Sequence, residues 1–485
     1  MPPVWELIMN IPKGVRVDRY VDREVVQRIL KFLDAIVLFA ASIMIALMSA
    51  LDLAVTTPEV IGFLAAELAL ACVFSMRALG LYDVKALTLG PWTALRATAC
   101  CFIACGALYV LTHLFLLEMD FGWMYLWMIV LPTYFGATRG TVSLWAGPRA
   151  AEGSFRQRIA IVGGGKSAEE ALNLLETSSG LDIEIIGLFD DRDDVRSPQS
   201  IRNHHKIGRI EELGQYARTE RVDLIIVAIP LSAETRLLTI LKRLWELPVD
   251  IRISGQSSSL KLNARAYTYL GKLALLPVFD RPLTGWSLFQ KEALDRILAL
   301  AGIIVLAPLM LAVGLAVKFE SKGPMIFRQK RYGFNNEMIE VYKFRSMHAE
   351  RCDHQAAKLV TRDDPRVTKV GRFIRRTSLD ELPQLFNVLQ GHLSLVGPRP
   401  HATQAKAADI LYETVVDGYF ARHRVKPGIT GWAQINGWRG ETDTRDKLEQ
   451  RVKHDLEYID RWSLGFDLYI IAKTPFVLFK VESAY

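Results

Sequence analysis

Cysteine is scarce in this sequence and follows no metal-binding pattern. The 485 residues contain five cysteines, of which Cys72, Cys100, Cys101 and Cys105 lie in apolar segments and Cys352 does not. The paired Cys or Cys/His spacings that bind zinc are missing, and no disulfide framework is apparent. We therefore expect the first four cysteines to act as small hydrophobic residues.

A cleavable signal peptide is not expected either. The first long apolar run is not followed by a small-residue cleavage pattern, and further apolar runs come after it.

Charged residues are nearly absent from four runs within the first 150 residues. These runs cover residues 35–51, 60–76, 97–117 and 121–137, and only the second contains an acidic residue, Glu67. Each run approaches the roughly 20 residues that cross the hydrocarbon core of a bilayer. Half of the chain is apolar and the mean hydropathy is +0.17. Residues 1–150 are therefore predicted to form a bundle of four transmembrane helices.

Lys and Arg are absent from two of the connections between these runs, 52–59 and 118–120. By contrast, six Lys or Arg residues precede the first run, three lie between the second and third, and four lie within 138–158. Because positive charge favours the cytoplasmic side, this alternation places both ends of the bundle in the cytoplasm.

Residues 155–255 alternate between strand and helix patterns, which predicts a Rossmann-like parallel α/β domain. Gly163 and Gly165 lie between the first strand and helix, where glycines let a pyrophosphate approach a helix N-terminus. A regulatory or scaffolding domain without a ligand is the alternative, because no dehydrogenase substrate domain follows. Residues 256–289 are predicted to be a linker.

A fifth apolar run, 297–317, has Pro308 near its middle and basic residues at both ends. Proline removes a hydrogen bond from a helix and kinks it. We therefore expect residues 292–320 to form a re-entrant helix that enters the membrane and returns to the cytoplasmic side. A fifth crossing is the alternative, but it would place the basic residues downstream outside the cell.

Residues 290–485 are predicted to form an α-rich monotopic catalytic domain. Its basic segment after the apolar run includes Lys343 and Arg345, which are candidates to bind substrate phosphate. The net charge of +7 and a basic patch beside a membrane segment favour anionic lipids and phosphorylated substrates over nucleic acid. The apolar C-terminal stretch 465–481 is expected to lie at the membrane interface.

Asp380 and Glu381 stand side by side in the segment RRTSLDELP. Ser378 and Glu381 have the spacing of a capping box, so Glu381 alone could serve to start a helix. Asp380 is not needed for a cap. Two carboxylates suit Mg²⁺ bound to a pyrophosphate, and a carboxylate can also attack phosphorus. Arg375 and Arg399 flank the pair and could hold phosphate oxygens. Capping and chemistry both remain open on these residues alone.

Four motifs carry a resemblance to a known family. They are YKFRSM at 342–347, RRTSLDELPQLFNVLQGHLSLVGPRP at 375–400, VKPGITGWAQING at 425–437 and HDLEYIDRWS at 454–463. Together they resemble the bacterial polyprenyl-phosphate hexose-1-phosphate transferases, which are monotopic phosphoglycosyl transferases. The predicted helical bundle and middle domain resemble the long form of that family.

The resemblance implies an inner-membrane enzyme that starts a surface polysaccharide. Asp380 would attack the β-phosphate of a UDP-sugar, releasing UMP, and undecaprenyl phosphate would then take the sugar 1-phosphate. Glu381 would act with Mg²⁺ and the lipid phosphate, Arg375 and Arg399 would handle phosphate, and Pro308 would form the kink. Glucose is the expected sugar with galactose as the alternative, and a homodimer is expected. A membrane sensor or scaffold and a membrane dehydrogenase are the rival classes.

Overall fold

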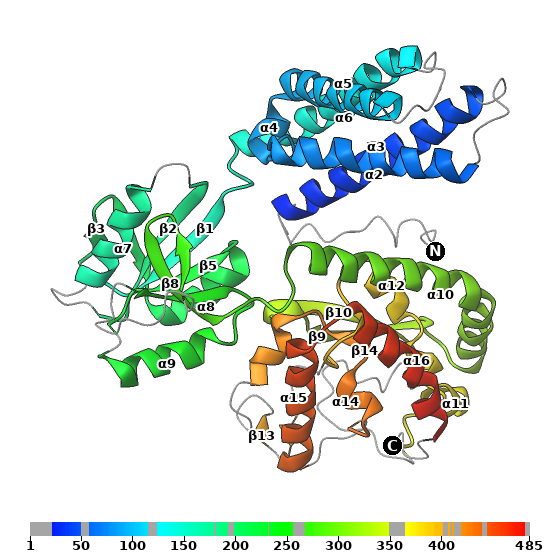
Figure 1. Ribbon diagram of the computed structural model, residues 1–485. Helices are drawn as coiled ribbons and strands as arrows, with labels where there is room; N and C mark the ends of the chain where they lie inside the picture. Colours follow the sequence, from blue (N-terminus) through cyan, green and yellow to red (C-terminus); the bar gives the residue numbers. More distant parts are fainter. Residues whose placement is uncertain are drawn as a thin grey trace. The chain divides into compact units, whose positions relative to one another are not determined.

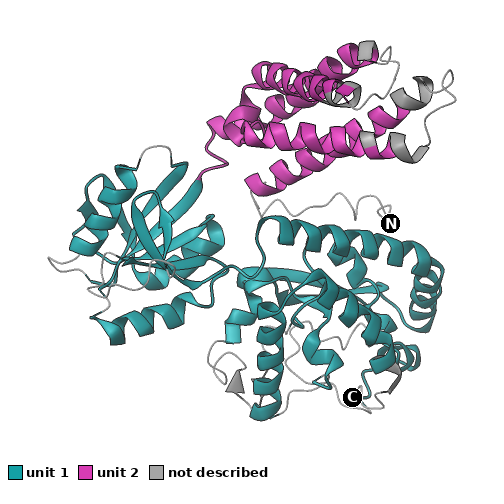
Figure 2. Ribbon diagram, viewed as in Figure 1, with its two compact units in different colours: residues 1–11, 157–485 teal, residues 12–156 magenta. Residues whose placement is uncertain are grey.

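The computed structural model describes residues 22–49, 58–114, 124–178, 181–192, 198–230, 232–255, 267–348, 364–400, 406–407, 410–411, 419–438 and 444–480. The chain divides into two compact units, one formed by residues 12–156 and the other by residues 1–11 and 157–485 (Figure 2).

The first unit is a bundle of long helices. Its elements are α2 (Arg23–Ser49), α3 (Pro58–Ala78), α4 (Val84–Thr88), α5 (Gly90–Leu114) and α6 (Met124–Ala151) (Figure 1). The four long helices coincide with the four apolar runs, so the prediction of a helix at each run is confirmed. Helix α2 begins about three turns before the apolar run and α6 continues well beyond it, since the flanking polar residues also favour helix.

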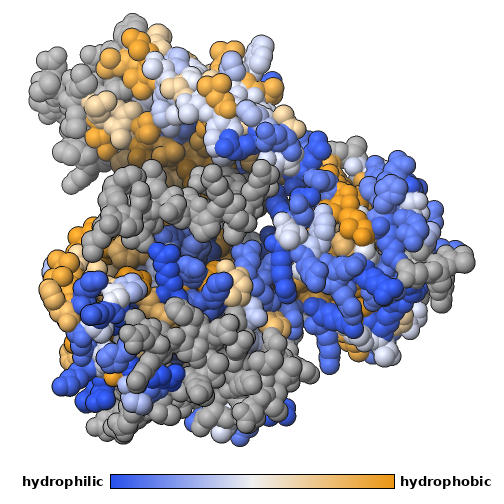
Figure 3. All heavy atoms as spheres, turned by 180° about the vertical axis from the view of Figure 1, so that it is seen from behind, coloured by the Kyte–Doolittle hydropathy of each residue, from blue (hydrophilic) through white to orange (hydrophobic). Residues whose placement is uncertain are grey.

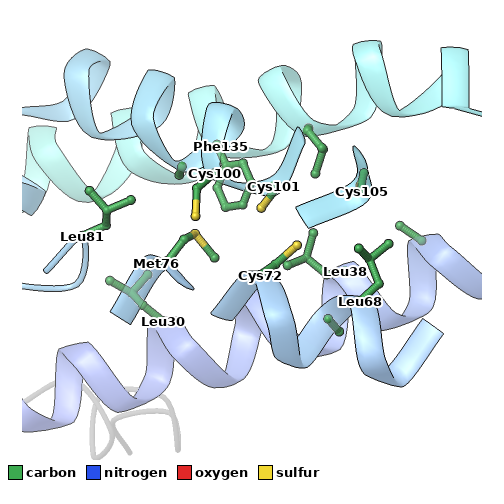
Figure 4. Close-up of a cluster of buried hydrophobic side chains, with 14 of the residues drawn as sticks. Leu30, Leu38, Leu68, Cys72, Met76, Leu81, Cys100, Cys101, Cys105 and Phe135 are labelled. Carbon is green, nitrogen blue, oxygen red and sulfur yellow. The ribbon is translucent and has the colours of Figure 1, made fainter. Parts of the chain in front are cut away.

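The bundle core contains the four described cysteines. Cys72, Cys100, Cys101 and Cys105 are each at most 6% exposed and pack with Leu38, Met76, Phe135 and other apolar side chains (Figure 4). The expectation that they act as small hydrophobic residues is confirmed. Cys352 lies outside the described residues.

One polar cluster interrupts this apolar core. The Asp34 carboxylate lies 2.5 Å from Arg139 Nη2 and accepts hydrogen bonds from the hydroxyls of Tyr82 and Tyr134, each at 2.8 Å. The Arg139 guanidinium also lies over the ring of Phe135. Both members of the ion pair are fully buried, so each depends on the other for compensation of its charge.

The middle of the chain forms an eight-stranded sheet in the order β3-β4-β2-β1-β5-β6-β8-β7. Its elements are β1 (Gln157–Val162), α7 (Lys166–Glu176), β2 (Ile183–Phe189), β3 (Ser200–Ile201), β4 (His204–Gly208), α8 (Ile210–Thr219), β5 (Leu224–Val227), α9 (Glu234–Leu244), β6 (Asp250–Ser254), β7 (Thr268–Leu270) and β8 (Leu273–Phe279). Strands β4, β2, β1, β5 and β6 pair in parallel, which confirms the predicted parallel α/β sheet.

Apolar residues on both faces of β1 explain how helices cover both sides of the sheet. Ile159 and Ile161 pack with residues of α7, whereas Ala160 and Val162 pack with residues of α8 and α9. Strands buried on both faces read as continuous apolar runs, as IAIV and LIIV do here.

The sheet continues into the stretch that was predicted to be a linker. Strand β8 pairs antiparallel with β6, and β7 pairs with β8, so the domain extends to Phe279 rather than ending at 255. Pro277 lies within β8, and this sequence lacks the alternation that marks a strand, so its pattern gave little sign of one.

The remainder of the second unit is mainly helical. It comprises α10 (Gly285–Glu320), β9 (Ile326–Tyr332), η4 (Phe334–Asn336), β10 (Met338–Phe344), α11 (Lys369–Arg376), η6 (Leu379–Glu381), α12 (Gln384–Leu389), β11 (Ser394–Val396), β12 (Lys406–Ala407), β13 (Ile410–Leu411), η7 (Tyr419–Arg424), β14 (Gly428–Thr430), α14 (Trp432–Ile435), α15 (Arg445–Asp460) and α16 (Leu464–Lys480). Strands β9 and β10 form a hairpin, and β11 pairs in parallel with β14.

Helix α10 contains Pro308 and changes direction along its length (Figure 1). Within the described residues, it is long and apolar enough to cross a membrane. The parts of α10 on the two sides of Pro308 pack on the rest of the domain, Ala299 with Val388 and Val317 with Phe344. Its middle does not: Val305, for example, is 75% exposed.

Candidate active site

The acidic pair lies on a short 3-10 turn, η6, between α11 and α12. The turn begins at Ser378, whose φ of +58° is left-handed, an uncommon conformation for a non-glycine residue. The Ser378 side chain accepts no capping hydrogen bond, and the Glu381 carboxylate points to Arg399 and Lys343 instead of back to the Ser378 backbone. The predicted capping box is therefore wrong, because a left-handed residue and a tight turn replace the extended cap that the motif requires.

Glu381 is held by two cations from elements distant in the sequence. Arg399 Nη2 lies 2.6 Å from Oε1 and its Nη1 lies 3.4 Å from Oε2, while Lys343 Nζ of β10 lies 2.9 Å from Oε1. Burial alone would raise the pKa of Glu381, but Arg399 and Lys343 outweigh it and hold that pKa well below its usual range. Glu381 therefore stays ionised and fixed in place.

Asp380 is buried beside this clamp but is less constrained. Its nearest cation is Lys343, whose Nζ lies 4.0 Å from Oδ2. Burial raises the pKa of Asp380, and the charge of Glu381 adds to that rise, against the opposing charges of Lys343 and Arg375. A desolvated carboxylate with few strong partners is a better nucleophile than one tied into an ion pair.

Of the other two predicted phosphate-binding residues, Arg375 lies near the acidic pair and Arg345 does not contact it. Arg375, at the end of α11, donates from Nε to Ser346 Oγ at 2.7 Å, and its charge reaches Asp380. Arg345 is buried and donates from Nη2 to the carbonyl and hydroxyl of Ser321, at 2.7 and 2.9 Å. In the described part of the chain, Arg345 thus bonds to the end of α10 and not to the acidic pair.

Arg331 is a further residue of the site that no motif in the sequence singled out. Arg331 on β9 donates from Nη2 to Gln329 Oε1 at 2.8 Å and from Nη1 to the carbonyl of Pro400. Burial lowers its pKa to about 10, with a contribution from the neighbouring charge of Arg399. Because side chains alternate along a strand, Gln329 and Arg331 lie on the same face of β9. A count of the basic residues in this segment does not reveal that arrangement.

The site as a whole carries excess positive charge. Lys343, Arg331 and Arg399 surround two carboxylates, and Arg375 adds a fourth cation nearby. An excess of partly buried cations over anions is stabilised by an added anion, and the arginines can meet phosphate oxygens with paired N–H groups. The arrangement suits a pyrophosphate.

The predicted Mg²⁺ ligands fit that ion in number and type. No group of three or more His, Cys, Asp or Glu side chains converges within the described residues, where Asp380 and Glu381 are the adjacent carboxylates of this site. Mg²⁺ commonly binds one or two carboxylates together with substrate phosphates. Asp380 and Glu381 fit this mode, with Asp380 the carboxylate that is less occupied by cations.

The middle-domain glycine turn is separate from the acidic pair. Gly163 has φ +111°, and a Cβ there would lie 3.0 Å from the Ala228 carbonyl, so packing against the end of β5 requires this glycine. Gly165, with φ +81°, precedes α7. Asp190, at the end of β2, is paired with Arg192 and Arg236, at 2.9 and 2.8 Å.

Comparisons with known proteins assign the class. Residues 286–481 match the family described as bacterial sugar transferase, and residues 77–255 match a family described as CoA-binding domain. The first match covers the acidic pair together with Lys343 and Arg399, which contact it. With the relatives below, it shows that this chain belongs to the bacterial sugar transferase family.

Three relatives of this chain are named as undecaprenyl-phosphate sugar-phosphate transferases. The undecaprenyl-phosphate glucose phosphotransferase of Komagataeibacter xylinus is 41% identical over 66% of this chain and 58% of the relative. The UDP-glucose:undecaprenyl-phosphate glucose-1-phosphate transferase of Escherichia coli (strain K12) is 37% identical over 72% of this chain and 73% of the relative. The undecaprenyl-phosphate galactose phosphotransferase of Salmonella typhimurium is 28% identical over 75% of this chain and 76% of the relative.

Proposed function

We propose that this chain transfers glucose 1-phosphate from UDP-glucose to undecaprenyl phosphate, releases UMP, and so begins a bacterial surface polysaccharide. The observation that carries the proposal is the asymmetric acidic pair. Glu381 is clamped by Arg399 and Lys343, whereas Asp380 is buried but weakly paired. The sugar transferase match covers this pair, which favours a transferase over a scaffold or a dehydrogenase. Glucose is chosen because the relatives from Komagataeibacter xylinus and Escherichia coli, 41% and 37% identical over 66% and 72% of this chain, are named for it, whereas the galactose relative is 28% identical over 75%.

The proposed reaction has two displacements at one phosphorus. A carboxylate oxygen of Asp380 forms a bond to the β-phosphorus of UDP-glucose, and the bond from that phosphorus to the bridging oxygen breaks, so UMP leaves with the electron pair. A phosphate oxygen of the lipid then attacks the same phosphorus and frees Asp380. Arg399, Arg331 and Lys343 would stabilise the charge that develops on the phosphoryl oxygens. Bound Mg²⁺ would neutralise part of the diphosphate charge.

The test measures UMP. Purified protein with Mg²⁺ and undecaprenyl phosphate should release UMP from UDP-glucose faster than from UDP-galactose or UDP-N-acetylglucosamine. Release that is fastest from UDP-galactose would replace the sugar but keep the reaction, whereas no release from any UDP-sugar would refute the transferase.

The proposal includes a membrane arrangement in which α2, α3, α5 and α6 cross the bilayer and α10 enters and returns. Large apolar side chains are exposed on the bundle and on α10, as the hydrophobic regions of both units show (Figure 3). Because the parts of α10 on the two sides of Pro308 pack on the same catalytic domain, a helix that crossed fully would separate parts that are in contact. A homodimer stays a prediction.

The arrangement predicts where the ends of the chain lie. A reporter fused after residue 485 and one inserted at residue 155 should both report the cytoplasm, since the bundle crosses four times and α10 does not cross. A reporter in the connection 52–59 should report the outside and serves as the positive control. A C-terminal reporter found outside would contradict the re-entrant helix.

Activity should depend on pH through Asp380. As a nucleophile Asp380 must be ionised, so the rate should fall as pH drops through its raised pKa. Lys343 opposes that rise, so Lys343→Gln should raise the pKa further and move the acid limb of kcat/KM to higher pH. Lys330→Gln removes an exposed charge from the same hairpin and should leave the limb in place. An acid limb unchanged by Lys343→Gln would contradict this role for Lys343.

A further inference from the structure

The motif HDLEYIDRWS, at 454–463, has no part in the site described above. It covers the end of α15 and the turn into α16. Asp455 and Tyr458 are each 2% exposed, which is unusual for a carboxylate. In the described part of the chain, Asp455 forms an ion pair, and the Tyr458 hydroxyl forms hydrogen bonds, with residues other than Asp380 and Glu381. A buried acid that touches no reacting group needs another explanation.

Asp455 is joined to the acidic pair through two arginines. Its Oδ2 lies 2.6 Å from Nη2 of Arg422, a fully buried residue. The same Nη2 donates to the backbone carbonyl of Arg399 at 2.8 Å. The Arg399 guanidinium in turn holds Glu381 with two N–H···O contacts. Asp455 therefore orients the guanidinium that fixes the backbone of Arg399.

Tyr458 anchors the same segment three residues earlier. Its hydroxyl lies 3.1 Å from the Val396 carbonyl and 2.8 Å from Asp467 Oδ1. Lys291 Nζ of α10 donates to the Val396 carbonyl at 3.0 Å and pairs with Asp467 Oδ2 at 2.8 Å. A buried network from α10, α15 and α16 thus converges on this one carbonyl.

The backbone between these two anchors is also held closely. The Gly397 amide donates to Thr430 at 2.9 Å, and the Gly428 amide donates to the Pro398 carbonyl at 3.0 Å. A Cβ on Gly431 would lie 2.3 Å from the Gly397 carbonyl, so only glycine permits this approach. Successive groups from 396 to 400 therefore have fixed partners.

We propose that Asp455 and Tyr458 are positioning residues for the transfer reaction, which hold segment 396–400 so that Arg399 stays on Glu381. The inference rests on the proposed function for its kinetic consequence. An arginine side chain has much rotamer freedom, and its two-point contact with a carboxylate needs a fixed backbone. If Arg399 moves, Lys343 is left to pair with both carboxylates, and Asp380 loses its freedom to attack.

The kinetic test is a double-mutant cycle. Asp455→Asn keeps the shape and removes the charge, and we expect kcat/KM for UDP-glucose to fall about ten- to a hundredfold, as a misplacement of about 1 Å can cause. Arg399→Lys removes the two-point contact. If Asp455 acts through Arg399, the double variant should be no slower than Arg399→Lys alone. Multiplied effects of the two substitutions would overturn the proposal.

The matched control is Glu449→Gln. Glu449 lies on the same helix, but its ion pair with Arg445 is exposed, so removal of its charge should change kcat/KM little. If Asp455→Asn does not accumulate in membranes, Tyr458→Phe removes one oxygen from the second anchor. It should show the same non-additivity with Arg399→Lys, and additive effects would again overturn the proposal.

A second measurement needs no turnover. In detergent-solubilised protein, hydrogen exchange of the backbone amides in 394–400 should be faster in Asp455→Asn than in wild type or Glu449→Gln. Unchanged exchange in this segment would overturn the proposal. If the wild type released no UMP, the proposed function would fail, and this measurement would still decide whether Asp455 holds the segment.

Discussion

Asp380→Asn should abolish UMP release, with a loss of at least about 10³-fold in kcat/KM, because an amide cannot act as the attacking carboxylate. Asn has nearly the same shape, and Asp380 makes its nearest ionic contact at 4.0 Å, so the fold should tolerate the change. The measurement is UMP release from UDP-glucose under single-turnover conditions, beside a thermal unfolding curve of each protein.

Glu381→Gln gives the contrasting result. It removes the partner of Arg399 and Lys343 and leaves two partly buried cations without their carboxylate, so it should lower both activity and stability. If Asp380→Asn kept its turnover and only Glu381→Gln lost it, Glu381 and not Asp380 would be the nucleophile. Equal loss of stability in both variants would show that Asp380 is also structural.

An experiment with radioactively labelled UDP-glucose distinguishes a covalent reaction step from substrate binding. With UDP-glucose labelled in glucose and no lipid acceptor, wild type should retain label on the protein after denaturation, whereas Asp380→Asn should retain none. Label on the wild type at a residue other than Asp380 would refute the proposed covalent step.

Long periodic or apolar segments were predictable from the sequence. The four apolar runs and α10 became helices, and the alternating stretch from residue 155 became a parallel sheet, because burial over many residues outweighs local preference. The association of Lys343 and Arg399 with the acidic pair was anticipated only as a general role in phosphate binding. Their direct ion pairs with Glu381 depend on tertiary contacts between residues up to 38 positions apart in the sequence.

Three predictions differ from the structure because each concerns a feature that depends on three-dimensional geometry and not on a local sequence pattern. The capping box failed because Ser378 takes a left-handed conformation that a four-residue motif does not encode. Arg345 bonds to the end of α10, although two residues earlier Lys343 bonds to Glu381, because the first follows the end of β10 and the second lies within it. Strand β8 joins the sheet by pairing with β6, and β7 joins it by pairing with β8, which no local pattern reveals.

The ion pair of Asp34 and Arg139 supplies the second large expected effect, on the stability of the helical bundle. Arg139→Leu should lower the free energy of unfolding by about 3–5 kcal/mol, since it leaves a fully buried carboxylate without its cation. Asp34→Leu should cost a similar amount by leaving Arg139 unpaired. The measurement is denaturant or thermal unfolding of the protein in detergent.

The double variant Asp34→Leu, Arg139→Leu decides what the pair contributes. Two apolar side chains remove both buried charges at once, so the double variant should be more stable than either single variant and recover most of the loss. Glu24→Gln, which breaks an exposed pair with Arg28 on the same helix, should change stability by no more than about 1 kcal/mol. A double variant as unstable as the sum of the singles would show that the hydroxyls of Tyr82 and Tyr134, which lose their acceptor with Asp34, are what the bundle depends on.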